Sequence, residues 1–548
     1  MENFLHILAI AGAAVFMVFF FGLCIFVHEL GHFLAAKWRG LNVTAFSIGF
    51  RKIWGKTWNG VEYRIGWIPF GGYVEIPQVD GDGKKEGEEK ITPAKPVDRM
   101  ITVVAGPFFN FIFGFLVAAV IWIVGIPQDT PDLKEIEVAM IQTDSPEYRA
   151  GLRKGDVIIK LNEKELNTSW NGVFKDILTT VGPVSMTVRR DGKIFEISYL
   201  PAVNKQVLPD EEIAYPFFRP KLPILLYPAK DSPAAKAGIK KGDKVLSVNG
   251  KHPVSISDFE TMIDDSKGKA VSLLIERNGK EIPFENIVPE PMKINGKGGV
   301  WQVGIVYQPH AEKLTIINLA EDGAARKAGL QENDIISKIN GKTPVPAEFP
   351  KLVQESQGTP LKMEIVRNGT SLEVDLTPVF HRYYTIGVQY AYIAHPTPWA
   401  QFTNAMSLTF KSMRAIGYSL GNTLGLTEQQ TTVKPKHMSG PLGIGRILYR
   451  SVYDGSIIQG LNIVVLITFS LGLLNLMPFP VLDGGHFVLA LLEIIFRKPV
   501  PEKYLNPISY AFVAIIVAFM LFVTFYDAKR VIGDFMPQKT PTITAPEK

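Results

Sequence analysis

The stretch IFVHELGHFLAAKW, from Ile25 to Trp38, closes an apolar run that begins at Leu5 and is almost uninterrupted. A helix over that run is long enough to cross the roughly 30 Å hydrocarbon core of a bilayer. A secretory signal peptide would have a basic leader and a shorter apolar core, but the leader here is MENF. The sequence therefore predicts a first membrane-spanning helix within residues 1–38, with two histidines and a glutamate near its end.

Three further apolar stretches predict membrane-spanning helices at residues 101–126, 457–487 and 505–527. The chain has 548 residues, too many for one hydrophobic core, and its mean hydropathy is +0.13. These values are typical of a protein that lies partly in the membrane and partly in water. The net charge is only +5 and no basic, aromatic-rich stretch is present, so the sequence predicts no nucleic-acid partner.

Lysine and arginine residues in the short loops predict the orientation of these helices, because basic loops stay on the cytoplasmic side. Eleven of them lie from Lys37 to Arg99, and the loop between the third and fourth spans carries three more. Residues 39–100 are therefore predicted to form a cytoplasmic loop. The long segment 127–456 is predicted to lie on the opposite side of the membrane.

That long segment contains a repeat. DSPEYRAGLRKGDVIIKLN begins at Asp144, DSPAAKAGIKKGDKVLSVNG begins at Asp231, and EDGAARKAGLQENDIISKING begins at Glu321. Each copy reads as a short helix, a glycine that ends it, a turn and a strand, and a basic residue follows at nearly the same spacing. The sequence predicts three β-rich units, at residues 133–200, 218–290 and 301–380.

The repeated pattern resembles the PDZ domain in its bacterial, circularly permuted form. That resemblance implies small β-barrels that bind extended peptide segments by adding a strand. The alternative is that the units are spacers that only fill volume.

The chemistry of the first helix depends on the spacing of its polar groups. His28 and His32 are four residues apart and share one helical face, and Glu29 lies beside them. This is the zinc-and-base arrangement of many metalloproteases, in which the glutamate takes a proton from a water that attacks a carbonyl. Because Cys24 is the only cysteine, further metal ligands must be His, Asp or Glu.

The third apolar stretch supplies candidates for the third ligand, in LNLMPFPVLDGGHFVLA. Pro478 and Pro480 must interrupt a helix there, and a broken backbone at membrane depth is tolerated only inside protein or beside a wet cavity. Asp483 follows this break, Asn475 precedes it, and His486 competes with Asp483 as a ligand. The chemistry of the side chains does not decide between these two. A kinked packing helix that is capped by the aspartate is the alternative.

HELGH and NLMPFPVLDGG together resemble the paired motifs of the site-2 protease family of intramembrane zinc metalloproteases. The PDZ-like insertion is similar to that of its bacterial, regulator of sigma-E protease branch. Further motifs resemble the same branch: VAGPFFNFIFG in the second helix, FSIGF and IPFGGYVEI in its membrane-associated β-loop, and SGPLGIG before the third span. The resemblance covers most of the chain, but members of this branch carry one or two PDZ units rather than three.

The resemblance implies a polytopic α-helical protein of a bacterial inner membrane, with an inserted array of three PDZ-like domains on the periplasmic side. It implies that His28, His32 and Asp483 bind Zn²⁺ and that Glu29 is the general base. Asn475 is expected to bind the substrate backbone or the developing oxyanion, or to be purely structural. The implied substrates are transmembrane segments of single-pass proteins, such as anti-sigma factors or remnant signal peptides.

Two segments have open interpretations. The strand-like part of the cytoplasmic loop, residues 43–76, is expected either to pair with an extended substrate or to be a plain hairpin. The amphipathic stretch 399–427 is expected to lie on the membrane surface, or alternatively to form a fifth span.

Two rival functions predict different behaviour. A non-catalytic PDZ membrane scaffold would bind no zinc and would be insensitive to Glu29→Gln. A metal transporter would need charged ligands along several spans, whereas here they occur in two.

Overall fold

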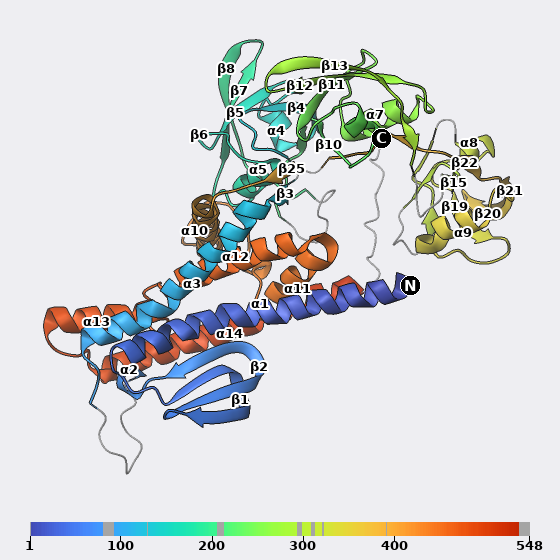
Figure 1. The fold of residues 1–548 in the computed structure, drawn as a ribbon. Helices are drawn as coiled ribbons and strands as arrows, with labels where there is room; N and C mark the ends of the chain where they lie inside the picture. The colour runs from blue at the N-terminus through green and yellow to red at the C-terminus, as the bar shows by residue number, and fades with distance from the viewer. Residues whose placement is uncertain are drawn as a thin grey trace.

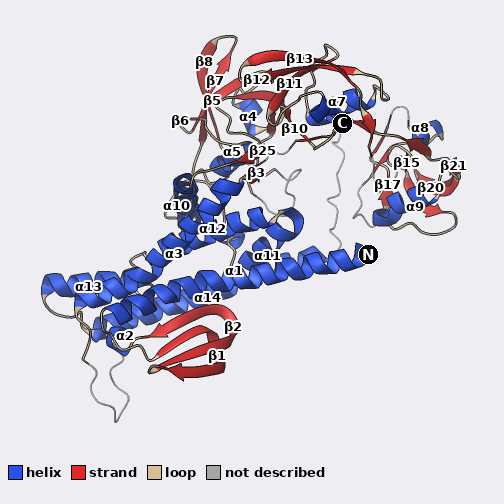
Figure 2. Cartoon of the chain, in the orientation of Figure 1, coloured by secondary structure: helices blue, strands red, loops and turns tan. Residues whose placement is uncertain are grey.

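The computed structural model describes residues 2–80, 92–128, 130–204, 213–292, 299–307, 313–320, 323–390 and 392–535. Long helices form a bundle at one end of the molecule, and most of the strands gather at the other end (Figure 1, Figure 2). The charged stretch 81–91 and the first two residues of the third repeat, 321–322, lie outside the described residues.

Within the described residues, four helices are long and apolar enough to cross a membrane, as the sequence predicts. They are α1 (Glu2–Trp38), α3 (Pro96–Val124), α12 (Ile457–Asn475) and α14 (Glu502–Phe535). Helix α3 packs against both α1 and α12. The contact with α1 requires a glycine, because a methyl group on Gly31 would lie 2.3 Å from the carbonyl oxygen of Ala105.

Over residues 457–487 the chain forms two helices rather than one. Helix α12 ends at Asn475, and α13 (Asp483–Phe496) begins after a short irregular segment. Pro478 and Pro480 lie in that segment, where their missing N–H groups prevent the helical hydrogen-bond ladder from continuing. The break places Asp483 at the first residue of a new helix.

A long β-hairpin, β1 (Ala45–Trp58) and β2 (Val61–Glu75), precedes the short helix α2 (Pro77–Asp80) and lies beside the bundle (Figure 1). Residues 45–48 pair with 72–75 on one side and with 62–65 on the other, and 54–58 pair with 61–65. The hairpin therefore folds back into a small sheet. Its outermost segment, 72–75, lies against α1.

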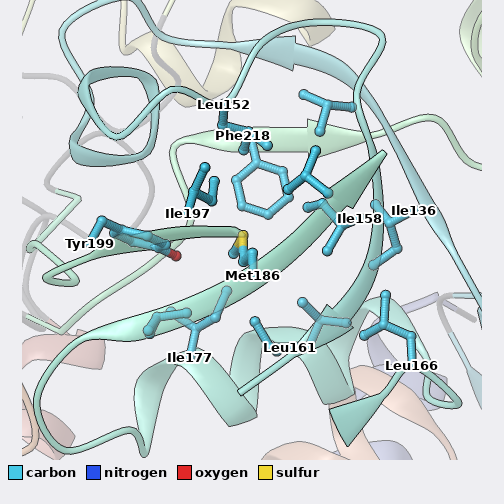
Figure 3. Packing of buried hydrophobic residues seen from close by; sticks show 14 residues of the cluster. Ile136, Leu152, Ile158, Leu161, Leu166, Ile177, Met186, Ile197, Tyr199 and Phe218 are labelled. Atoms are coloured by element: carbon cyan, nitrogen blue, oxygen red, sulfur yellow. The ribbon is translucent and has the colours of Figure 1, made fainter. Parts of the chain in front are cut away.

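The sheet of the first β-unit is completed by a strand that lies after the predicted range 133–200. Its sheet has the strand order β8-β7-β5-β4-β9, with β6 paired to β5, and apolar residues such as Phe218, Ile158 and Met186 fill its core (Figure 3). The elements are β4 (Ile136–Ile141), α4 (Pro146–Arg149), β5 (Val157–Leu161), β6 (Lys164–Glu165), α5 (Trp170–Leu178), β7 (Val184–Arg190), β8 (Lys193–Tyr199) and β9 (Phe218–Pro220).

The second and third β-units are nested. Strand β24 (Val388–Gln389), which follows the third unit in the chain, pairs with β10 (Leu225–Pro228) of the second unit, and Ile386 joins the second core. Val303, which precedes the third unit's repeat, lies in the third core, beside β16 (Ile305–Val306). The third unit is thus inserted between the body of the second unit and its closing strand.

The remaining elements of these two units follow the repeat. The second unit contains β10 (Leu225–Pro228), α6 (Pro233–Lys236), β11 (Asp243–Val248), α7 (Ile256–Asp264), β12 (Val271–Arg277) and β13 (Lys280–Ile287). The third contains β17 (Leu314–Thr315), β18 (Asn318–Leu319), α8 (Ala324–Lys327), β19 (Ile335–Ile339), η1 (Pro346–Glu348), α9 (Phe349–Glu355), β20 (Leu361–Arg367) and β21 (Thr370–Leu376). Two short ribbons connect them, β14 (Glu290–Pro291) with β23 (Tyr384–Thr385) and β15 (Val300–Gln302) with β22 (Val379–His381).

The constant spacing of the repeat has a physical cause. In the first unit the guanidinium of Arg190 donates to the buried carboxylate of Asp156 at 2.5 and 2.7 Å and to the carbonyl oxygen of Gly151 at 2.7 Å. The same three-way contact recurs in the other two units, where the Arg, Asp and Gly are Arg277, Asp243, Gly238 and Arg367, Asp334, Gly329. It ties the last residue of one strand to the turn after the short helix.

The whole insertion is joined to the bundle by a narrow neck. Strand β3 (Ile126–Gln128), directly after α3, pairs with β25 (Tyr392–Ala394), directly before α10 (Pro398–Thr423). Helix α10 is not among the candidate membrane spans of the described residues. Instead it packs on the bundle, where the ring of Phe402 lies 5.4 Å from that of Phe115 and 5.1 Å from that of Phe469. Lys411 of α10 also donates to Asp176 of the first β-unit at 2.5 Å.

A buried carboxylate organises the segment before the third span. Asp527 of α14 is fully buried and accepts hydrogen bonds from the backbone N–H groups of Gly440 and Gly443, both at 2.9 Å. These amides begin α11 (Pro441–Arg450), which lies between η2 (Pro435–His437) and η3 (Ser451–Gly455). The first two glycines of the SGPLGIG motif, Gly440 and Gly443, therefore make room for Asp527.

Candidate active site

Helix α1 brings two imidazoles onto one face. The rings of His28 and His32 are one helical turn apart, with centroids at 4.8 Å and planes at 87°. Their Nε2 atoms are 3.2 Å apart, so both point toward the same place. Both side chains are largely buried at 12% exposure, within a helix that is long and apolar enough to span a membrane.

The carboxylate of Asp483, the first residue of α13, lies close to the Nε2 atoms of both histidines. Its Oδ2 atom lies 3.2 Å from His28 Nε2 and 3.5 Å from His32 Nε2. The glycines that follow it allow this approach. A methyl group on Gly484 would lie 2.2 Å from the carbonyl oxygen of Leu476, and one on Gly485 would lie 2.0 Å from that of Phe479. The first turn of α13 can fold this tightly onto the preceding segment only because both residues lack a side chain.

These three groups fit a metal ion. One atom from each of His28, His32 and Asp483 lies within 4.8 Å of the others. Asp483 Oδ2 is buried and makes no hydrogen bond within the described part of the chain, which is costly for a carboxylate unless a cation is its partner. Two imidazoles and one carboxylate are the donor set of catalytic zinc sites that keep a fourth position open. His486, the rival ligand, is not part of this group.

Residues of α3 contact the Nδ1 atoms of both histidines. His32 Nδ1 lies 2.8 Å from the carbonyl oxygen of Thr102, and His28 Nδ1 lies 3.1 Å from Nδ2 of Asn110. Gly106 lies between these contacts, and a methyl group there would come within 2.3 Å of His32 Nε2. The sequence reasoning assigned no role to these residues, although the VAGPFFNFIFG motif contains Gly106 and Asn110.

Glu29 faces a different neighbour. It lies against the outermost segment of the hairpin, where a methyl group on Gly72 would be 3.0 Å from Glu29 Cγ. The backbone N–H of Val74 is also beside its carboxylate. The candidate base therefore lies between the two histidines and a sheet edge.

Asn475 is the last residue of α12 and lies beside the two histidines and Asp483. Its Nδ2 atom lies 3.3 Å from His28 Nε2, so this amide faces the same space as the imidazoles. The structure thus brings His28, His32, Asp483 and Asn475 together, and Glu29 is adjacent to them in α1.

The fold and this site define a class of protein, the metal-dependent peptidases whose active site lies within the membrane bundle. The chain belongs to peptidase family M50, whose family model matches residues 16–519. It is accordingly an intramembrane metalloprotease of regulated intramembrane proteolysis, as predicted from the sequence.

Curated relatives agree with this assignment. The chain is 26% identical over 519 residues to the regulator of sigma E protease of Haemophilus influenzae, covering 92% of this chain and 96% of that protein. It is 27% identical over 508 residues to regulator of sigma-E protease RseP of Escherichia coli, covering 88% and 90%. Relatives from Vibrio cholerae and Pasteurella multocida carry zinc metalloprotease in their names, which supports zinc as the metal. The relatives and the four candidate spans together indicate an inner-membrane protein.

Among solved structures, the chain is similar to a PDZ domain protein from Parabacteroides distasonis. The match has 11% sequence identity, covers 48% of this chain and 98% of that one, and has a TM-score of 0.16. A score this low supports no structural argument.

Proposed function

We propose that this protein cleaves transmembrane segments of other membrane proteins at a zinc ion held by His28, His32 and Asp483. The observation that supports this most strongly is the buried Oδ2 atom of Asp483, which faces two imidazole nitrogens and makes no hydrogen bond within the described residues. When bound there, zinc would polarise the scissile carbonyl and lower the pKa of a water molecule to about 7.

Side chains of the protein transfer the proton and stabilise the developing charge. Glu29 takes a proton from the attacking water and returns it to the leaving amine nitrogen, a role that suits a carboxylate beside the ligands rather than among them. Asn475 Nδ2 donates to the developing oxyanion or to the substrate backbone, because it already faces the same space as His28 Nε2. The surrounding helices limit the access of bulk water.

The substrate needs an extended backbone, since a helical peptide bond is shielded by its own hydrogen bonds. The sheet edge at residues 72–75 is suited to hold it. This segment pairs with 45–48 on one side, pairs with no strand of the described chain on the other, and lies against Glu29. An unwound substrate that adds to this edge would pass directly beside the base.

The three β-units act as PDZ-like domains on the periplasmic side of the inner membrane. The repeat, the basic cytoplasmic loops and the family's domain arrangement support this. The substrates would be single-pass proteins, such as anti-sigma factors or remnant signal peptides, whose outer portions have already been shortened. The β-units would exclude substrates that still carry bulky outer domains.

The first experiment is cleavage of a tagged single-pass substrate in membranes by the wild type and by Glu29→Gln at matched expression. Removing a general base should lower the rate by about 10²–10⁴-fold. Glu428→Gln, at an exposed position after α10, is the matched control and should cleave normally. Equal cleavage by the wild type and Glu29→Gln would refute the proposal and favour the PDZ scaffold.

A further inference from the structure

The environment of His28 contains a group whose role is still unexplained. Asn110 of α3 is fully buried at 0% exposure, within a stretch, residues 103–124, whose other residues are all apolar. Its Nδ2 atom lies 3.1 Å from His28 Nδ1, and its Oδ1 atom is buried without a hydrogen-bond partner among the described residues. An unsatisfied amide oxygen in a membrane bundle is costly unless it is used in another state of the site.

The two histidines differ in how their second nitrogen is held. A neutral imidazole has one N–H, so a ring that offers its Nε2 lone pair to a metal must carry the hydrogen on Nδ1 and needs an acceptor there. For His32 that acceptor is the carbonyl oxygen of Thr102, at 2.8 Å. For His28, the group in hydrogen-bond contact with Nδ1 is the amide of Asn110, through its nitrogen rather than its oxygen.

We propose that Asn110 is a positioning residue that selects the tautomer of His28. With Nδ2 toward His28 Nδ1, that ring nitrogen is the acceptor, so the hydrogen of His28 is on Nε2 and its lone pair is not available to a metal. A half-turn of the amide presents Oδ1 instead, accepts Nδ1–H, and frees Nε2 as a metal ligand. This inference rests on the proposed zinc site and goes beyond it, because it assigns a role to a residue outside the ligand set.

The shape of α3 supports the assignment. Gly106 and Asn110 are four residues apart, so they share the helical face that meets the histidines. A methyl group on Gly106 would lie 2.9 Å from His28 Cε1, so only glycine lets α3 come near enough for Asn110 to reach the ring. Two residues of the VAGPFFNFIFG motif thus act together. Gly106 lets the helices approach because it has no side chain, and Asn110 contacts the His28 ring through its amide.

The competing explanation is that Asn110 only stabilises helix packing. Two substitutions separate the explanations. Asn110→Asp keeps an acceptor toward His28 Nδ1, whereas Asn110→Leu has a similar size and offers none. Thr468→Val is the control, because Thr468 is equally buried in α12 and contacts Cys24 rather than a histidine.

The experiment measures zinc affinity of the purified full-length protein by competition with a chromophoric chelator, together with the visible spectrum of the Co²⁺ form. We expect Asn110→Leu to bind zinc about 10–100-fold more weakly and to alter the Co²⁺ spectrum. Asn110→Asp and Thr468→Val should retain the wild-type affinity. Wild-type affinity and spectrum in Asn110→Leu would overturn the inference.

The zinc-induced rise in melting temperature gives an independent readout. A packing role lowers the melting temperature of the metal-free and zinc-loaded proteins alike, whereas a positioning role reduces the rise that zinc produces. If Asn110→Leu cannot be purified, Asn110→Ala, which adds no volume, is measured in its place. A wild-type protein that binds no zinc would refute the proposed function itself. If the wild type binds zinc and Asn110→Leu shows the same zinc affinity and the same zinc-induced rise in melting temperature, only this inference is refuted.

Discussion

At the scale of single residues, several buried polar groups contact a partner on a helix that is distant in the sequence. Asp483 faces two imidazoles, Thr102 offers its carbonyl oxygen to His32, and Asp527 caps α11. Each of these contacts joins helices that are distant in the sequence. Such a contact stabilises a membrane bundle because an unsatisfied polar group in hydrocarbon would cost free energy.

Glu147 of the first β-unit is a buried carboxylate with an incomplete set of partners. It is 2% exposed, it accepts a hydrogen bond from the N–H of Phe217 at 3.3 Å, and its second oxygen has no partner among the described residues. The corresponding positions of the other two units are the buried alanines Ala234 and Ala325. Burial raises the pKa of Glu147 above its ordinary value.

A raised pKa predicts a pH dependence of stability. Between the unfolded and folded pKa values the folded state binds more protons, so the free energy of unfolding falls as the pH rises through that interval. We expect Glu147→Gln, which keeps an acceptor but no charge, to be more stable than the wild type at neutral pH and to lack this decline. Thermal unfolding as a function of pH tests it, with the exposed Glu165→Gln as control. A decline that persists unchanged in Glu147→Gln would contradict the assignment.

At the scale of elements, the sequence predicted the four long helices well, because each is a continuous apolar run. It predicted the HELGH face equally well, since a spacing of four residues decides which side chains share a side of a helix. The chemistry of the side chains could not decide between Asp483 and His486, and only the family resemblance favoured Asp483. That choice depends on how tightly Gly484 and Gly485 let α13 turn back, which has no periodic signature.

The same reasoning explains what sequence patterns missed. Asn110 and Asp527 act across helix contacts, and a single polar residue in an apolar run does not name its partner. The closing strands were also ambiguous. The stretches around Val303 and Ile386 are both short and apolar, and each contains a glycine, so their sequences do not reveal which unit each one completes.

The contact between α11 and α14 leads to a test at this scale. Asp527→Asn removes the charge that two backbone amides and Arg530 share, the last at 3.1 Å. Breaking a buried pair of this kind costs roughly 3–5 kcal/mol, so we expect a clearly lower melting temperature in detergent. Lys529→Gln, exposed on the same helix, should melt like the wild type. An unchanged melting temperature in Asp527→Asn would mean that this carboxylate does not hold α11.

At the scale of the whole molecule, the neck determines how the β-units are attached. Pairing of β3 with β25 brings the two ends of the insertion together at the end of α3. A deletion should therefore remove residues 130–390 as one piece, because a cut at the end of the third unit would leave the second unit's closing strand behind. The deletion would also remove the contact between Lys411 and Asp176 and the contacts that the insertion makes with the segment at 430–432.

If the β-units exclude substrates with bulky outer domains, this deletion should release that restriction. We expect the 130–390 deletion to cleave both a full-length and an outer-truncated single-pass substrate, whereas the wild type cleaves only the truncated one. The measurement is the fraction of each substrate cleaved in membranes, with Glu29→Gln in the deletion background as the control for activity. Unchanged selectivity would rule out the gate.

The distance along the chain between the two halves of the site has a consequence for biosynthesis. The HELGH helix is made long before α13, which carries its carboxylate partner. If His28, His32 and Asp483 hold the metal, as we propose, a chain that has been made only as far as α12 lacks one of the three ligands. Such a chain should be unable to hydrolyse its neighbours, so the enzyme would become active only after α13 has been made.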